Sequence, residues 1–274
     1  MAEDKKPTIV DENTKSLQVV ASTKVGEVLR TTHAQTLINH YGSEVKAAAF
    51  VSSVQNIIKS NPKLAACTVQ SQGNAILQMA SLKFYPSEIM AEASFIPYGN
   101  EMKFQIQYQG WITLLSRAGV SGLQAEIVRE NDKFSIRNGV VDHEIDYRMS
   151  ESERGEEIGA YAEAYFGGRK QSKYMNGKDI IAYAKKFSKS FTKKDSPWNK
   201  ENDPELWMWK KTAIIQLAKL LPKNDNNGAA QYIKKAIEME YQEDSRMYDA
   251  IRESDKLRMG NNVEEDVIDI ASED

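Results

Sequence analysis

Lysines cluster on one side of a helix that the sequence predicts over residues 179–194. The helical spacing puts four apolar residues on one stripe: Ile180, Ala184, Phe187 and Phe191. The opposite side carries Lys185, Lys186, Lys189 and Lys193, and Lys194 ends the segment. Such a helix is suited to holding a row of phosphates, because each neutralised phosphate releases counterions. A merely solvated face is the alternative. A membrane-surface helix is less favoured, because the apolar stripe is needed to attach the helix to its own domain.

A second helix is predicted over residues 204–221, with Asp203 as its N-cap and Pro204 at the first helical position. Its buried stripe is expected to contain Leu206, Trp209, Ala213, Leu217 and Leu220. Lys210 and Lys211 lie side by side in mid-helix and are further candidates for phosphate contacts. Trp198, in the Pro197-Trp198 pair before this helix, is a candidate for stacking on bases, whereas Trp209 is assigned to the core.

The third polar surface belongs to a predicted β-hairpin, formed by residues 93–98 and 102–108 around Gly99-Asn100. Alternation along its second arm puts Lys103, Gln105 and Gln107 on one side, with Tyr108 at the end. A line of amides and one amine without a carboxylate can bind phosphates, sugars and base edges without repelling a polyanion. An ordinary exposed sheet face is the alternative.

Charge is unevenly distributed along the 274 residues, whose formal net charge is −3. Residues 178–223 hold eleven lysines against five acids, a local charge of +6. Residues 236–274 hold thirteen acids against four basic residues, a local charge of −9. This asymmetry is typical of a polyanion-binding body with an acidic tail, although a solvated face beside a solubilising tail would give the same pattern. We expect the tail to compete with the polyanion or to dock a basic partner.

Most enzymatic machinery has no matching motif here. The chain has no G-x-x-x-x-G-K-[S/T] loop for nucleoside triphosphates and no nucleophile elbow. Three scattered histidines and the single Cys67 give no zinc spacing. Carboxylates are plentiful, so a metal-dependent nuclease stays open as the enzymatic alternative. Neither a secretory signal nor an apolar run long enough to span a membrane is visible, so a cytoplasmic location is expected.

Changes of periodicity predict an α+β fold with a central, mostly antiparallel sheet that includes the hairpin and is flanked by helices. Helices are expected over residues 25–59, 68–82 and 110–118, the first interrupted near Tyr41-Gly42, and strands over residues 123–130, 133–137, 142–147 and 158–166. Domain organisation is expected to be a flexible N-terminal arm (1–22), a main domain (23–225) and a C-terminal helix with an acidic tail (229–274).

Several short segments, taken in order, carry a resemblance to a known family. They are FIPYGN at residues 95–100, FQIQYQGW at 104–111, RAG at 117–119, GAYA at 159–162, Pro197-Trp198, and KKT at 210–212 followed by KLLP at 219–222. Together they resemble the central signature of the RecT family of phage single-strand annealing proteins, over roughly residues 45–224. No signature position departs visibly from the family pattern.

The resemblance implies a protein that binds single-stranded DNA, anneals complementary strands without ATP or covalent chemistry, and assembles into homo-oligomeric rings or filaments. It implies no cofactor, with magnesium considered only as a modulator of assembly, and it adds Arg117 to the candidate DNA contacts. A phage exonuclease and the host single-strand binding protein are the implied protein partners, with the C-terminal segment as the partner-binding piece. A metal-dependent nuclease and a non-catalytic DNA-binding adaptor are the alternatives.

Overall fold

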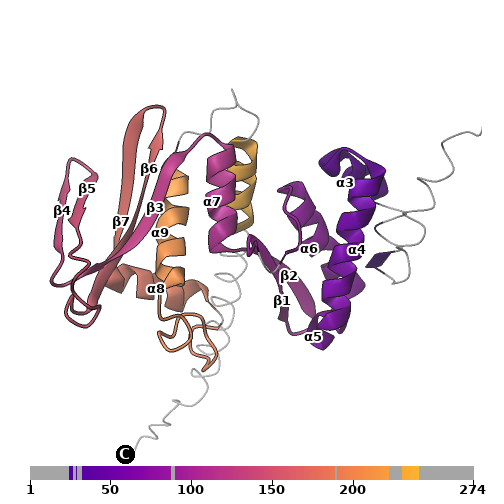
Figure 1. Ribbon diagram of the computed structural model, residues 1–274. Coiled ribbons are helices and arrows are strands. Elements are labelled where there is room, and N and C mark those ends of the chain that lie inside the picture. The colour runs from indigo at the N-terminus through magenta and orange to yellow at the C-terminus, as the bar shows by residue number, and fades with distance from the viewer. Residues whose placement is uncertain are drawn as a thin grey trace, which may run out of the picture. The chain divides into compact units, whose positions relative to one another are not determined.

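The computed structural model describes residues 25–26, 29, 33–87, 90–188, 190–221 and 230–240. These residues form two compact units (Figure 1). Unit 1 contains the described residues up to Ser121 together with residues 230–232, and unit 2 contains residues 122–221 together with residues 233–240. The predicted arm (1–22) and the acidic tail after residue 240 lie outside the described residues.

Unit 1 begins with helices whose ends follow from their capping residues. Their bounds are Ala34–Tyr41 (α3), Glu44–Ser60 (α4), Pro62–Ala65 (α5) and Val69–Ser81 (α6). Gly42 ends α3 in the left-handed region, at φ 78°, where a glycine has no steric penalty. The Ser43 hydroxyl then accepts a hydrogen bond from the Lys46 backbone N–H at the start of α4. The predicted interruption near Tyr41-Gly42 is therefore confirmed.

The predicted hairpin is present as strands Ala93–Tyr98 (β1) and Glu101–Ile106 (β2), which pair antiparallel across Gly99-Asn100. Met102, Phe104 and Ile106 are buried, so one face of β2 packs on the helices of unit 1. The Met102 N–H donates to the Ser71 hydroxyl of α6 at 3.0 Å, which fixes the strand along that helix (Figure 1). The second strand ends two residues earlier than the alternation predicted.

Helix Tyr108–Arg117 (α7) follows β2 directly, and its first turn depends on a glycine. Gly110 lies against the Glu92 backbone carbonyl so closely that a Cβ at this position would overlap the oxygen. The Glu92 carbonyl also accepts from the Gln107 N–H at 2.9 Å. The side-chain carboxylate of Glu92 accepts from the Thr113 hydroxyl at 2.8 Å. The fully buried Trp111 follows. The QGW triplet is therefore explained by close packing at a strand-to-helix junction.

Unit 2 is built on a sheet in the order β3-β6-β7, from strands Ser121–Arg129, Glu157–Phe166 and Arg169–Asn176. β6 and β7 pair antiparallel across the turn at Gly167-Gly168. A separate antiparallel hairpin consists of Lys133–Arg137 (β4) and Val140–Glu144 (β5). These sheets confirm the predicted α+β class.

The two faces of β6 have different side chains and different neighbours. Tyr161 packs with Val128, Val141 and the partly buried Phe134, in a cluster between the sheet and the β4–β5 hairpin. Alanines alternate with this tyrosine and are buried on the opposite face: Ala160, Ala162 and Ala164. Helices Gly177–Phe187 (α8) and Trp207–Leu220 (α9) cover that face (Figure 1). Small side chains there let the helices approach the sheet closely.

The segment between α8 and α9 corrects two predictions. The helix predicted over residues 179–194 ends at Phe187, after which Ser188 is extended and its hydroxyl bonds the Ser190 hydroxyl. Serine side chains offer the backbone such alternatives to helix hydrogen bonds. α9 begins at Trp207 and not at Pro204, because Leu206 is in the left-handed region. Leu206, and not Asp203, is therefore the N-cap residue, although the Asp203 carboxylate accepts from the Met208 N–H in the first turn of α9 at 3.0 Å.

Burial around α9 and the presence of β7 also differ from the predictions. Leu220, expected in the buried stripe, is 61% exposed, whereas Lys211 and Thr212 are buried. α9 is thus enclosed on most sides, and the amphipathic pattern was a poor guide. β7 was not predicted, because its sequence RKQSKYMN has no clean alternation and its residues are mostly half-exposed.

Candidate nucleic-acid interface

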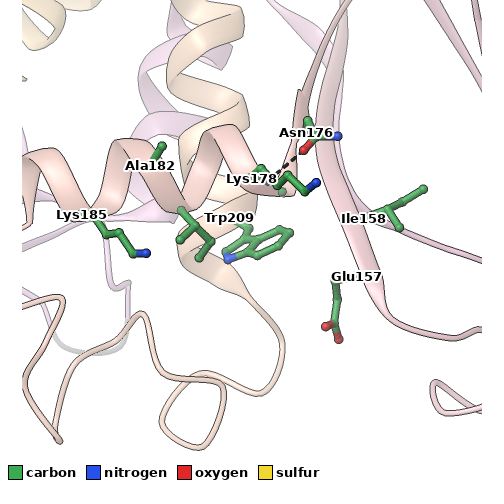
Figure 2. Close-up of a pocket in the computed structure, with 9 residues that line it drawn as sticks. Glu157, Ile158, Asn176, Lys178, Ala182, Lys185 and Trp209 are labelled. Carbon is green, nitrogen blue, oxygen red and sulfur yellow. Dashed lines mark hydrogen bonds between the residues drawn. The ribbon is translucent and has the colours of Figure 1, made fainter.

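An open pocket of about 540 Å³ lies in unit 2 beside α8, the start of β6 and the first turn of α9. Its lining comes from the start of β6, from Asn176 and one face of α8, and from Trp209 of α9: Glu157, Ile158, Asn176, Gly177, Lys178, Ile181, Ala182, Lys185 and Trp209. Figure 2 shows the Trp209 indole between the side chains of Lys178 and Lys185, with Ile158 and Glu157 on the side away from Lys185. The pocket therefore joins an apolar interior to charged edges.

The two lysines lie on one face of α8, two turns apart. Lys178 and Lys185 are separated by seven residues, which corresponds to about 10 Å along a helix axis. Both side chains are exposed, and within the described residues neither ammonium has a carboxylate at salt-bridge distance. Lys185 was a predicted candidate. Lys178 was missed, although its i−7 spacing from Lys185 was available as a signal.

Asn176 begins α8 and fixes its own orientation by capping. Its Oδ1 accepts from the Lys178 backbone N–H at 2.9 Å (Figure 2), which leaves the amide nitrogen as a donor at the pocket edge. Gly177 follows, and a Cβ there would lie 2.9 Å from the Trp209 indole. The glycine thus lets the indole lie directly beneath the first turn of α8.

The acidic edge of the pocket is neutralised by two cations. Glu157 Oε1 lies 2.8 Å from a guanidinium nitrogen of Arg129 and 2.6 Å from Lys200 Nζ. Burial alone would raise the pKa of Glu157, but the Lys200 ammonium and the Arg129 guanidinium outweigh it and hold that pKa below its usual range. Glu157 is therefore an ionised acceptor whose charge is compensated.

Lys210 and Lys211 have different surroundings. The Lys210 Nζ lies 4.8 Å from the ring centre of Trp207, and this tryptophan is 43% exposed. Together they present a cation and an aromatic surface to solvent. Lys211 is only 5% exposed. Its predicted role as a surface phosphate contact is therefore not supported by its position, because a buried ammonium cannot reach a backbone passing over the surface.

The remaining basic candidates of unit 2 are divided between α8 and the loop at residues 188–206. Lys186 is exposed on α8, with its Nζ 5.1 Å from the centre of the Phe187 ring. Lys193 and Lys194 are exposed, but on the loop, so the continuous helical track predicted for them is wrong. Trp198 is half-buried against Phe191, and Lys189 lies outside the described residues.

The hairpin candidates lie in unit 1 and differ from the predicted arrangement. Lys103 and Gln105 are on the less buried face of β2, but Glu101 shares that face and its carboxylate lies 2.8 Å from the Lys103 ammonium. The prediction of a face without a carboxylate is therefore wrong, because the strand begins one residue earlier than expected. Gln107 and Tyr108 are at the start of α7 and not on the strand.

Arg117 is engaged within unit 1. Its guanidinium donates to the backbone carbonyls of Leu82 at 2.9 Å and Lys83 at 3.4 Å, and it lies over the Phe84 ring. The side chain thus joins the end of α7 to the segment after α6. This geometry assigns Arg117 a structural contact.

The model of the RecT family matches residues 48–249, which is most of the chain. The chain belongs to the RecT family. The match covers the hairpin of unit 1 as well as the pocket of unit 2, and it confirms the resemblance carried by the FIPYGN and FQIQYQGW segments.

Two curated relatives are similar over part of their lengths. Protein RecT of Escherichia coli (strain K12) is 32% identical over 175 residues, which is 60% of this chain and 62% of that protein. The uncharacterized protein YqaK of Bacillus subtilis (strain 168) is 26% identical over 159 residues, 58% of this chain and 54% of YqaK. The matched region thus spans less than two thirds of each relative.

A buried charge network, which the sequence did not reveal, supports the outer side of unit 2. Asp132 accepts from two guanidinium nitrogens of Arg154, each at 2.8 Å, and lies 3.0 Å from His143 Nε2. His143 Nδ1 lies 3.4 Å from the Tyr161 hydroxyl. The Asp132 and His143 side chains are 2% and 1% exposed, so this His–Asp pair has no access to a substrate. Its role in this RecT-family fold is to fix the β4–β5 hairpin on the sheet.

Two further observations concern the described residues alone. None of their helices is long and apolar enough to cross a membrane. No group of three or more His, Cys, Asp or Glu side chains among them is placed to hold a metal ion. The expectation of no resident metal and no ATP stays a prediction.

Proposed function

We propose that this chain binds single-stranded DNA and anneals complementary strands without ATP. One structural observation carries the proposal: Lys178 and Lys185 lie at the edge of an open pocket with no acidic partner among the described residues. Membership of the RecT family supports a role in DNA recombination. The lysines would hold phosphates, and each contact would release counterions, so binding weakens steeply with salt.

The geometry supports a protein that holds the backbone and leaves sequence discrimination to base pairing. Exposed ammonium groups at Lys185, Lys186, Lys193 and Lys194 are point charges without the bidentate geometry that identifies particular bases. One subunit has few such contacts. Assembly into a homo-oligomeric ring or filament would multiply them along the strand, and we include this assembly in the proposal.

The test mixes two complementary oligonucleotides with the protein, no nucleotide cofactor and a chelator, and follows duplex formation by fluorescence quenching between labelled strands. Faster duplex formation that falls with salt supports the proposal. Failure to accelerate duplex formation rejects annealing. Degradation of a labelled strand on adding magnesium would instead favour a metal-dependent nuclease, and DNA binding without annealing would favour an adaptor.

Partners and setting belong to the same proposal. A phage exonuclease that exposes single strands would supply the substrate, and the host single-strand binding protein would compete for it or deliver it. Action with these two partners would take place in the bacterial cytoplasm. Magnesium, in this proposal, would affect only the assembly of subunits.

The acidic segment after residue 240 is proposed as the partner-binding piece. A deletion that tests it should begin at Tyr241, because residues 230–240 are helical and bury Ala230, Ile233, Ala236 and Ile237. We expect the shortened chain to bind DNA as well as the full chain or better. Loss of DNA binding would contradict this assignment.

A further inference from the structure

The interior of the pocket in unit 2 is suited to a flat, apolar group. Ile158, Ile181, Ala182 and Trp209 supply its apolar surface. The Trp209 indole is held against Gly177, so its orientation is fixed before any ligand arrives. A volume of about 540 Å³ is in the range of pockets that hold small molecules. Trp209 is 9% exposed, as expected for a core residue, so the part of its indole that lines the pocket is a small, preformed aromatic surface. Such a surface favours packing by another aromatic ring.

The edge of the pocket adds directional groups. The amide nitrogen of Asn176 can donate, because its oxygen is engaged in capping α8. Glu157 lines the pocket with a side chain that is 10% exposed, and because its Oε1 already pairs with Arg129 and Lys200, its second carboxylate oxygen is the atom that can accept. A donor and an acceptor beside an apolar surface match the edge of a nucleobase, which combines ring nitrogens, carbonyls and amino groups. Lys178 and Lys185 stand on either side, where phosphates flanking that base would lie (Figure 2).

We propose that this pocket binds one unpaired nucleobase of the DNA strand, stacked at Trp209, with flanking phosphates on Lys178 and Lys185. The inference rests on the proposed function, since it names the part of the nucleic acid that the same site takes. A base stacked inside a duplex cannot enter the pocket without being unpaired first. The pocket therefore favours single strands over duplexes and releases its base when a complementary strand pairs with it.

The experiment compares two oligonucleotides of equal length and charge, one of deoxyadenosine and one in which every nucleotide is a tetrahydrofuran abasic analogue. We expect the full-length wild-type protein to bind the first about tenfold more tightly, since stacking of one base on an aromatic side chain is worth about that factor. Ala182→Trp fills the exposed pocket wall and should reduce this ratio severalfold. Ala182→Ser, the matched control, should keep it.

A second measurement needs no variant. An oligonucleotide containing 2-aminopurine should change its emission on binding wild-type protein, and free adenine-rich strand should reverse the change. If wild-type protein binds neither oligonucleotide, the proposed function itself fails. If it binds and anneals, yet 2-aminopurine does not respond or Ala182→Trp keeps the full preference for bases, the base pocket is wrong while the proposed function stands.

Discussion

Lys200 Nζ lies 2.6 Å from Glu157 Oε1, and this ion pair joins the loop at residues 188–206 to the start of β6 at the pocket edge. Glu157 is shared with Arg129, whose side chain is 6% exposed, whereas Lys200 is 56% exposed. The Glu157 carboxylate thus pairs with one buried cation and one solvated cation. The ion pairs with Arg129 and with Lys200 should therefore differ widely in their contribution to stability.

Substitution at each end of this pair separates the two contributions. Lys200→Gln removes an exposed partner and should lower the free energy of unfolding by less than about 1 kcal/mol. Glu157→Gln leaves the Arg129 guanidinium with one fewer buried counter-charge and should cost about 3 kcal/mol. Urea unfolding followed by circular dichroism measures both. Equal losses would show that Arg129 does not depend on Glu157.

Neutralising the pocket lysines should change the salt dependence of DNA binding. The pair Lys178→Gln with Lys185→Gln should reduce the slope of log affinity against log salt by about 1.4, or about 0.7 for each phosphate contact on a single strand. The control pair Lys46→Gln with Lys63→Gln removes two exposed lysines of unit 1. Fluorescence anisotropy over a range of salt gives the slopes. If both pairs change the salt slope equally, the pocket lysines have no special part in DNA binding.

Substitution of Lys210 should affect DNA binding, whereas substitution of the neighbouring Lys211 should affect stability. Lys210→Ala removes a cation beside the exposed Trp207 and should weaken single-strand binding severalfold with little change in stability. Lys211→Ala removes a buried stem and should lower the free energy of unfolding by about 2 kcal/mol. Anisotropy and urea unfolding, measured on both variants, decide the assignment. Weaker DNA binding by a fully stable Lys211→Ala would restore its predicted role.

Local signals were enough to predict much of this fold. Alternation and a turn pair gave the β1–β2 hairpin, and Gly119, at φ 85°, ends α7 as its position after Ala118 predicted. These features depend on neighbours in sequence. The β4 strand matches its prediction at both ends for the same reason, because turn residues flank it at Asn131-Asp132 and Asn138-Gly139.

Other features depend on contacts between residues far apart in the chain, and these contacts leave no local signal in the sequence. Lys211 looks like a surface lysine until packing buries α9 on most sides. The pocket needs β6, α8 and α9 to meet, and only Lys185 of its lining was a predicted contact. His143 has no metal-ligand spacing in the sequence, and the residue that pairs with it, Asp132, comes from the turn before β4. Residue spacing predicts which side chains share a face of one helix or strand, but it does not predict which faces of different elements pack together.

The buried network around Asp132 should make stability depend on acid. Burial alone would raise the pKa of Asp132, but hydrogen bonds from Arg154, the Arg129 backbone and His143 lower it to about 2. A folded pKa below the unfolded value of about 4 means stability that is fully present above about pH 5 and is lost as the pH falls from about 5 to 2. The loss should approach about 2 kcal/mol. Urea midpoints of wild type and Asp132→Asn should converge over this range, and a constant difference would contradict the assignment.

Two glycine substitutions test whether the QGW triplet reflects packing. Gly110→Ala would drive a Cβ into the Glu92 backbone carbonyl, so the junction between β2 and α7 must open. The expected loss is at least about 3 kcal/mol of unfolding free energy, in line with other overpacked and strained sites.

Gly73→Ala is the matched control. Gly73 lies within α6 with nothing within 4 Å of its Cβ position, so alanine there should be neutral or stabilise by up to about 1 kcal/mol. Thermal unfolding of both variants measures the difference. A Gly110→Ala protein as stable as Gly73→Ala would contradict the packing explanation of the triplet.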